Sequence, residues 1–170
     1  MATPITVRDA TDADAEAITA IHNVQGVGTT ASYALTKETA AERIAWLHRQ
    51  RDHRHPVLVA TDTQGRVLGF ADYDRFRSLP GYDLTVEHSV YVTAGHEREG
   101  VGAALMARLI ELARDLGMHA MVGVIDADNT ASIAFHERLG FRNCGTLPQV
   151  GRKFGRWLDV SLLVKILSPE

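Results

Sequence analysis

Residues 85–125 read TVEHSVYVTAGHEREGVGAALMARLIELARDLGMHAMVGVI, and this stretch decides the fold class. A β-rich run over 85–92 leads through a turn with two glycines into a helix whose leucines recur at spacings of four, three and four. Those leucines are Leu105, Leu109, Leu112 and Leu116. Gly117 ends the helix as a C-terminal cap, and a short apolar strand follows over 120–125. The stretch therefore predicts one parallel strand–helix–strand crossover, right-handed by the usual rule.

The flanking segments predict antiparallel strands and further helices. Before the crossover we expect a strand over 5–8, a helix from Thr11 to about Val24, a helix over 39–51, and a hairpin with strands over 57–61 and 67–73. Gly26 and Gly28 interrupt the first helical pattern. After the crossover we expect a helix over 131–139 and strands over 142–150 and 157–167. The predicted fold class is α/β, with a mixed, mostly antiparallel sheet, a central parallel βαβ unit and flanking helices.

Composition limits the function classes. A chain of 170 residues, 45% hydrophobic and 23% charged, fits one globular domain spanning residues 1–170. The formal net charge of -3 and the lack of a dense Lys/Arg stripe argue against nucleic-acid or anionic-membrane partners. No apolar run is long enough to span a bilayer, and the first residues do not resemble a signal peptide, so we expect a cytoplasmic protein with a small-molecule partner.

The glycine-bearing turn is the first candidate site. Residues 97–103 read EREGVGA and lie between the end of a strand and the start of the leucine-striped helix. Unpaired N–H groups at a helix N-terminus attract anions, and glycines let a phosphate approach the backbone, so a pyrophosphate would fit here. Alternatively, Gly100 and Gly102 only permit a tight turn. A Rossmann site is disfavoured because the third glycine position is not glycine and no repeated βαβ units follow.

The strand before the turn carries an acid in its middle. Alternation places Glu87, Ser89 and Tyr91 on one face and His88 on the other with three valines. A carboxylate on a core strand is costly unless it is paired or used. Glu87 is therefore either a general base or one partner of a structural salt bridge.

Asn129 and His136 form the third candidate site. They are seven residues apart, about two helical turns, so both can face one ligand along a helix. A single histidine on a short helix can equally be a structural residue. The other histidines show no metal-ligand spacing, and we expect no metal. Cys144 is the only cysteine and is expected to be a small buried hydrophobe.

These stretches in this order resemble the GNAT superfamily of N-acetyltransferases, and in particular its phosphinothricin and methionine sulfoximine acetyltransferase branch. The resemblance rests on VEHSVYV at 86–92, on ASI and HERLGF within 131–141, and on GRKFGRWLD at 151–159, and it extends from about Ile5 to Leu167. It implies a GNAT-type sheet, acetyl-CoA as cosubstrate, and a homodimer. The cofactor-binding residues that it implies are Val90, Tyr91, Val92, Arg98, Glu99, Gly100, Val101, Gly102, Ala103 and Asn129.

The same resemblance implies catalytic roles for two residues. Glu87 matches the branch's general base, and His136 occupies the position of the general acid for the departing thiolate. The carboxylate of an amino-acid acceptor needs a cationic partner, for which we expect Arg77, with Tyr82 and Asp83 beside it as acceptor-binding residues. A solvated surface arginine is the alternative for Arg77.

The sequence departs from the family pattern in two places. Glu97 stands where the family usually has Gln or Arg, and an acid beside a pyrophosphate predicts weaker cofactor binding. The segment Asn23 to Tyr33 departs as well, because Gly26 and Gly28 stand where relatives tend to have bulkier residues, and this segment is expected to border the acceptor pocket.

The leading functional hypothesis is transfer of acetyl from acetyl-CoA to the α-amino group of phosphinothricin, methionine sulfoximine or methionine sulfone, by direct attack in a ternary complex. A second hypothesis keeps the chemistry and changes the acceptor to a peptide N-terminus, which needs an open groove, or to a polyamine, which favours an acidic pocket. A non-catalytic acyl-CoA-binding module and a dinucleotide-binding protein are the remaining alternatives.

Overall fold

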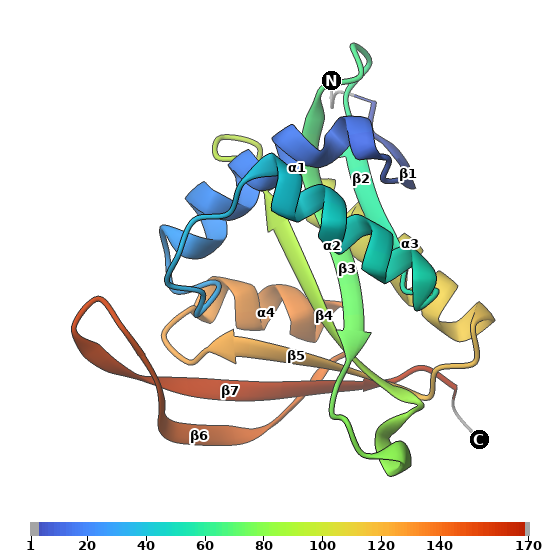
Figure 1. Ribbon diagram of the computed structural model, residues 1–170. Coiled ribbons are helices and arrows are strands. Elements are labelled where there is room, and N and C mark those ends of the chain that lie inside the picture. Colours follow the sequence, from blue (N-terminus) through green and yellow to red (C-terminus); the bar gives the residue numbers. More distant parts are fainter. Residues whose placement is uncertain (1–3, 169–170) are drawn as a thin grey trace.

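The fold is built on one sheet of seven strands, described by a computed structural model that covers residues 4–168. The strand order is β1-β2-β3-β4-β5-β7-β6, and β4 and β5 form the parallel pair while the other neighbours are antiparallel (Figure 1). This confirms the predicted mixed sheet with a single parallel crossover. The strands are β1 (Thr6–Asp9), β2 (Val57–Thr61), β3 (Val67–Arg75), β4 (Thr85–Val92), β5 (Ala120–Asp126), β6 (Arg142–Lys153) and β7 (Arg156–Ile166).

Helices cover both faces of the sheet. The helices are α1 (Ala15–Ile21), α2 (Ala40–Asp52), α3 (Val101–Asp115) and α4 (Thr130–Arg138), with 3-10 turns at Asp12–Asp14 and Pro80–Tyr82. The α1–α2 pair lies across β2 and β3 on the near side in Figure 1, and α3 lies behind the sheet. Thr39 caps α2 because its hydroxyl accepts from the Glu42 amide while the Glu42 carboxylate accepts from the Thr39 amide, a reciprocal capping box.

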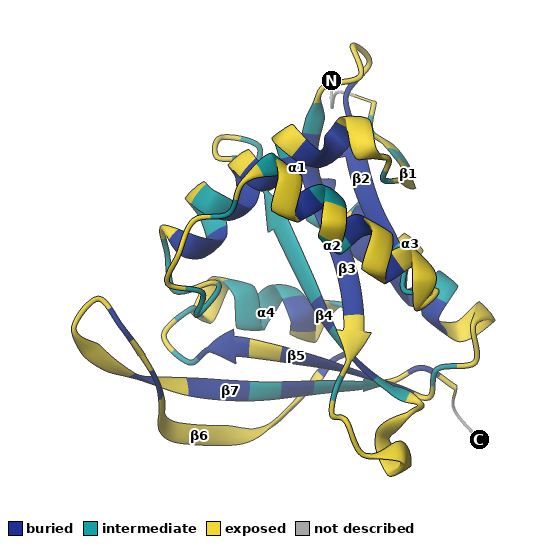
Figure 2. Ribbon diagram, viewed as in Figure 1, coloured by how far each residue is buried: buried dark blue, intermediate teal, exposed yellow. Residues whose placement is uncertain are grey.

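Each helical layer buries its own apolar core. On the α3–α4 side, Leu105 and Leu109 are fully buried against β-strand residues such as Met121 and Leu163. On the α1–α2 side, Ile18 and other apolar residues pack against Phe70 and its neighbours. Figure 2 shows that β2, β3 and β5 are largely buried, that β4 is mostly half-buried and that the outer strand β6 is largely exposed. Cys144 on β6 is exposed, so its expected burial is wrong. The predicted leucine stripe is thus confirmed at its first two members, and Leu112 is partly buried against the same core, whereas Leu116 lies past the helix end and is exposed.

β4 and β5 pair only at their beginnings. The parallel register joins Thr85 to Ala120, Val86 to Met121 and Glu87 to Val122, and then ends. Beyond this point the two strands diverge, as Figure 1 shows. No strand lies between the diverging parts of β4 and β5, so their facing backbone groups are not paired in the sheet. The divergence opens the middle of the sheet at the residues that the sequence marks as a candidate site.

The first helix differs from its prediction. The α-helix ends at Ile21 and continues as a π-helical turn over His22–Val27, so Gly26 lies inside helical structure and does not interrupt it. A Cβ at Gly26 would lie 2.8 Å from His22 Cδ2, which means that the glycine lets the wider turn pack against the histidine ring. The other predicted elements are present, although β6 continues three residues past its predicted end, to Lys153.

Candidate active site

The divergence leaves backbone groups of β4 free on one side. The Thr93 amide donates to Leu68 O at 2.8 Å, and Thr85 O accepts from the Phe76 amide. The backbone groups of the odd-numbered residues along β4 therefore bond to β3. Because backbone groups alternate along an antiparallel strand, those of Val90 and Val92 point to the opposite side, into the gap beside β5. The backbone groups of Tyr91 therefore bond to β3 and do not face this gap, contrary to the expectation that they would bind the cofactor.

A large groove of about 1020 Å³ runs from this gap to the start of α3. Its walls come from β4, from the turn before α3 and from the outer face of α4. The predicted cofactor residues that line it are Val90, Tyr91, Val92, Arg98, Gly100, Gly102, Ala103 and Asn129. Two others do not: Val101 is buried in the core, and Glu99 is exposed and binds the His96 ring at 2.8 Å. Sequence reasoning missed Phe135 and Arg138, which line the groove from α4.

The start of α3 is shaped to receive an anion. Its N-cap residue is Gly100, with φ 86, and no side chain caps the helix or brings an acid into its first turn. Gly102 follows on the groove wall, where a Cβ would lie 3.3 Å from Phe135 Cζ. Glu97 also lines the groove, but its carboxylate accepts a hydrogen bond from the Gly95 amide at 2.7 Å and so folds into its own turn.

A small cavity of about 260 Å³ lies beside the groove, on the side of the α1–α2 connection. It is walled by residues 30–33, by β4 and by the diverging half of β5. The groove and the cavity meet at shared lining residues: Ala31, Val90, Tyr91, Asn129, Ser132 and His136. Two ligands placed in these spaces would therefore come together beside β4, between Val90 and His136.

Glu87 lines the small cavity from β4. Its carboxylate takes part in none of the ion pairs among residues 4–168, so the structural salt bridge considered above does not hold it. Burial raises the pKa of Glu87, Asp74 raises it further from the facing position on β3, and the Arg77 guanidinium opposes the rise. A carboxylate with a raised pKa and access to a cavity is a stronger base than an ordinary surface carboxylate.

His136 is 3% exposed and reaches both spaces from α4. Its Nδ1 lies 2.7 Å from Ser132 O, and its Nε2 lies 2.8 Å from Nε2 of His88. His88 in turn donates from Nδ1 to Val122 O at 3.0 Å. Burial lowers the pKa of both rings, and that of His88 to about 3. Both nitrogens of His136 are therefore engaged by the protein in this structure.

His88 is a site residue that sequence reasoning missed as a partner of His136. The predicted alternation is correct: Val86 and Val90 pack with the α3–α4 core, and Tyr91 packs with the opposite core. His88 shares the face of Val86 and Val90, which is the face that α4 covers. The alternation correctly predicted which face of β4 His88 lies on. Pairing it with His136 also required knowing where α4 packs, which the sequence does not give.

Asn129 caps α4, because its Oδ1 accepts from the Ser132 amide at 3.1 Å. It lines both the groove and the cavity together with His136, so the two residues do address one space as their spacing predicts. The cap orients the helix start toward the gap and leaves the amide nitrogen of Asn129 for a ligand.

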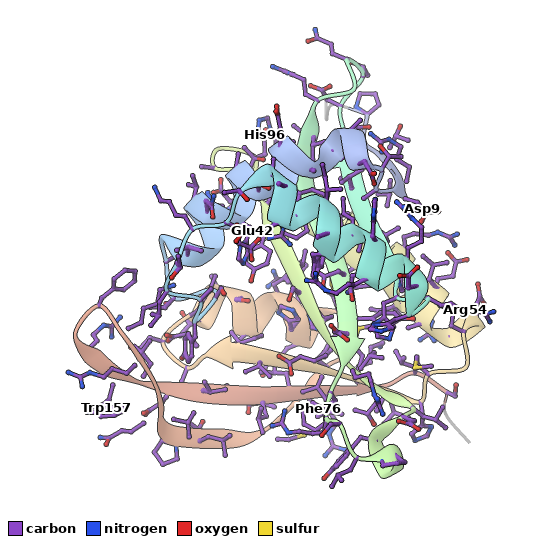
Figure 3. All side chains as sticks on the ribbon, viewed as in Figure 1. Asp9, Glu42, Arg54, Phe76, His96 and Trp157 are labelled. Carbon is purple, nitrogen blue, oxygen red and sulfur yellow. The ribbon has the colours of Figure 1, made fainter. Side chains whose placement is uncertain are left out.

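Arg77, Tyr82 and Asp83 lie outside both spaces. All three are exposed on the loop after β3, where Figure 3 labels Phe76. The Arg77 guanidinium lies 4.3 Å from the centre of the Phe76 ring, Tyr82 packs edge-on against the same ring, and Asp83 pairs with Arg75. Within this chain the loop is therefore a surface cluster. Residues 30–33 line the small cavity and belong to the segment Asn23 to Tyr33 that sequence reasoning expected beside the acceptor pocket, whereas Asp126 is a cavity residue that it missed.

Two further properties concern the described part of the chain. Among residues 4–168 no three His, Cys, Asp or Glu side chains gather closely enough to hold a metal ion. In the same range no helix has the length and apolar character needed to cross a membrane.

The sequence matches the model of the Acetyltransferase (GNAT) family over residues 18–141. It is 45% identical over 163 residues to the L-methionine sulfoximine/L-methionine sulfone acetyltransferase of Pseudomonas aeruginosa, covering 96% of this chain and 95% of that protein. It is 37% identical to the phosphinothricin N-acetyltransferase of Streptomyces viridochromogenes, covering 92% of this chain and 85% of that protein.

Solved structures agree with this similarity. An N-acetyltransferase from Staphylococcus aureus superposes with a TM-score of 0.93 at 39% identity, covering 98% of this chain and 100% of the other. A phosphinothricin acetyltransferase from Sinorhizobium meliloti in complex with acetyl-CoA gives 0.91 at 33% identity, covering 98% and 89%. The resemblance drawn from the sequence is thereby confirmed, and this chain belongs to the GNAT acetyltransferase family.

Proposed function

We propose that the protein transfers an acetyl group from acetyl-CoA to the α-amino group of a small amino-acid analogue, with methionine sulfone, methionine sulfoximine and phosphinothricin as the acceptors to test. The observation that carries this proposal is the meeting of the large groove and the small cavity between Val90 and His136, with Glu87 on the cavity side. Each space takes one substrate, which fits direct transfer in a ternary complex. The names of the similar proteins supply the acceptor class.

The large groove is the proposed acetyl-CoA site. The pyrophosphate would lie at the uncapped start of α3, where the dipole and free amides favour an anion. The pantetheine arm would follow the gap, where the backbone groups of Val90 and Val92 are free to bond to it. Asn129 and Ser132 at the start of α4 would face the arm from the other side.

The small cavity is the proposed acceptor site. An α-amino group has a reference pKa near 8, so it is mostly protonated at neutral pH and must lose a proton before it attacks. Glu87 would accept that proton, directly or through water. The amine attacks the thioester carbonyl, the oxyanion is stabilised by the free amide of Val92, and the thiolate leaves beside His136.

We also infer a homodimer in the cytoplasm, where acetyl-CoA is available. Large apolar side chains are exposed along β6 and β7, among them Leu147, Val150 and Trp157, and Trp157 projects from the outer side of the hairpin (Figure 3). A second copy that covers this strand pair would bury them. Light scattering after size exclusion tests the assembly, with a monomeric mass as the contrary result, and cell fractionation tests the location.

One observation favours a polyamine as a second candidate acceptor. The cavity is lined by the carboxylates of Glu87 and Asp126, and no Lys or Arg side chain is part of its wall in the described residues. An acidic wall attracts an acceptor that carries only ammonium groups. If amino-acid analogues are the acceptors, the partner of their carboxylate comes from outside this wall, and Arg77 of the same or the second subunit is the first residue to test.

Thiol release from acetyl-CoA tests the function. Methionine sulfone, phosphinothricin, spermidine and a short peptide are compared as acceptors, with Glu87→Gln assayed beside the wild type. Turnover with the amino-acid analogues that falls at least about 100-fold in Glu87→Gln would support the proposal, since general-base contributions are of this size. Glu137→Gln, an exposed glutamate on α4, is the matched control. Turnover with spermidine alone would select the second candidate, and thiol release that survives Glu87→Gln would remove Glu87 as the base.

A further inference from the structure

The wall of the small cavity opposite β4 is a segment without helix or strand. Residues 28–39 connect the π-helical turn to α2, and four consecutive members, Thr30 to Tyr33, line the cavity. Ala31 lines the large groove as well. No strand ladder holds this segment, so its shape depends on other contacts, and the width of the cavity depends on its shape.

Lys153 supplies three of those contacts from the far end of the chain. Its ammonium donates to Gly26 O at 3.1 Å, to Thr29 O at 2.6 Å and to Ser32 O at 2.5 Å. An ammonium has three donors, and here two of them bind carbonyls of this segment while the third binds Gly26 O in the π-helical turn just before it. Lys153 stands at the tip of the β6–β7 hairpin, where Phe154 and Gly155 turn with φ of 51 and 74, and Figure 1 shows this tip reaching toward the start of the segment.

The charge of Lys153 is not neutralised by an acid. The residue is 4% exposed, and it belongs to none of the ion pairs formed within residues 4–168. A buried ammonium is costly unless its hydrogens are bonded, so the three carbonyls and the lysine hold each other in place. A side chain that only filled space at this position would remove the donor of Thr29 O and of Ser32 O, whereas Gly26 O would keep the Thr29 amide at 3.2 Å.

A second contact from the same hairpin fixes the end of the segment. Gly151 lies under the Tyr33 ring, where an added Cβ would be 2.5 Å from Cδ2. The Tyr33 hydroxyl lies 3.4 Å from Asp159 O and 3.5 Å from Asp126 Oδ2, on β7 and β5. Two residues of the GRKFGRWLD stretch therefore hold both ends of the cavity wall, although neither lines the cavity itself.

We propose that Lys153 is a positioning residue for the acceptor: by binding Thr29 O and Ser32 O, and Gly26 O just before them, it fixes the 29–33 wall of the small cavity, and so it determines how tightly the acceptor, but not acetyl-CoA, is bound. This inference rests on the proposed function, because it takes the small cavity as the acceptor site. It assigns to the β6–β7 hairpin a role in substrate recognition at a distance from the reacting atoms.

Steady-state kinetics of Lys153→Met test the proposal. We expect the KM for methionine sulfone to rise about tenfold or more, while kcat at saturating acceptor and the KM for acetyl-CoA each change by less than about threefold. Arg152→Met is the matched control, because Arg152 is the exposed neighbour whose guanidinium lies over Trp157, and it should leave all three parameters unchanged. A folded Lys153→Met protein with wild-type acceptor KM would overturn the proposal, as would equal increases in both KM values.

Two further measurements keep the test decisive if Lys153→Met does not fold. Gly151→Ala should raise the acceptor KM selectively by displacing the Tyr33 ring, and a wild-type KM would count against the hairpin's role. In the unaltered protein, amides of 29–34 should exchange hydrogen more slowly than those of 77–83; equal or faster exchange in 29–34 would overturn the proposal. Hydrogen exchange needs no substrate, so it separates failure of this inference from failure of the acetyltransferase assignment, which would appear as absent turnover in the wild type.

Discussion

His88 Nε2 and His136 Nε2 lie 2.8 Å apart, between β4 and α4. The carbonyls of Val122 and Ser132, at the two Nδ1 atoms, can only accept hydrogen bonds. Two neutral rings that both donate to these carbonyls would bring bare lone pairs together at Nε2. Because burial lowers the pKa of both rings, a shared extra proton is disfavoured. One ring therefore gives up its Nδ1 donor. We assign this to His136, because the Ser132 hydroxyl, 3.5 Å from His136 Nδ1, can donate there instead, and this gain is set against the 2.7 Å contact of the bare Nδ1 with Ser132 O.

The resulting chain of donors runs from Ser132 through His136 to His88 and ends at Val122 O. It predicts that His88 fixes His136 as the Nε2–H tautomer. Replacing His88 by Phe leaves that N–H without an acceptor, and we expect a loss of about 1–3 kcal/mol in the free energy of unfolding. We also expect kcat to fall about tenfold while the affinity for acetyl-CoA stays within a factor of about two.

Urea unfolding and ¹⁵N histidine spectra check this prediction. The spectra should show His136 protonated at Nε2 in the wild type and a changed tautomer population in His88→Phe. His119→Phe, at an exposed histidine, is the control. A His88→Phe protein as stable and as active as the wild type would mean that the contact has no consequence.

The pair of residues around Glu87 predicts opposite shifts in the pH dependence of activity. Arg77 lowers the pKa of Glu87 and Asp74 raises it. Arg77→Ala should therefore move the acidic limb of kcat/KM to higher pH, and Asp74→Asn should move it to lower pH. Both side chains are exposed, so the shifts should shrink as salt is added. If both variants keep the wild-type pKa of the acidic limb, that limb reports the titration of a group other than Glu87.

Glu97 predicts a gain on substitution. It adds a negative charge to the wall of the large groove near the proposed pyrophosphate site, although its own bond to the Gly95 amide turns it into the loop. Glu97→Gln should lower the dissociation constant of acetyl-CoA about two- to fivefold at low salt, with less effect at high salt. Calorimetric titration measures this, and unchanged or weaker binding would show that the carboxylate does not act on the ligand.

The sequence was sufficient to predict the helices and strands, but not the contacts that shape the small cavity. Periodicity and turn residues located the crossover because Leu105 and Leu109 serve one local requirement, the burial of a helix face. The groove residues follow from the same local order of strand, glycine turn and helix. By contrast, Lys153 binds carbonyls of residues 26–32 although it is 127 positions away from Gly26 in the sequence. No local pattern predicts that contact.

The Arg77 expectation shows the same limit from the other direction. A basic residue near a catalytic strand in sequence suggested a clamp, yet in this chain the guanidinium lies over Phe76 and outside the cavity. Proximity in sequence to Glu87 places Arg77 close enough to influence the pKa of that carboxyl, but which space a loop side chain enters depends on packing that only the tertiary structure defines.

Two buried groups predict stability slopes of opposite sign. Burial lowers the pKa of His88 from 6.5 to about 3, so between these pH values the unfolded chain binds a proton that the native state does not, and stability falls as pH falls. Asp72, 8% exposed and on β3 of the same sheet, is the reverse: burial raises its pKa from 3.8 to about 7. Arg43 opposes that rise, and Asp74 and Glu87 add to it. Across this window the native state holds a proton that the unfolded chain releases, and stability falls as pH rises.

These slopes overlap between about pH 4 and 6.5, where each amounts to about 1.4 kcal/mol per pH unit for one proton and they largely cancel. Single substitutions should expose them. Asp72→Asn should make the free energy of unfolding rise more steeply with pH than in the wild type, and His88→Asn should make it fall. Urea unfolding at pH 4.5, 5.5 and 6.5 measures the difference, because all other titrating groups are common to the three proteins. Parallel curves would mean that neither group keeps its buried, neutral form, since a group that ionises as freely in the native state as in the unfolded chain contributes no slope.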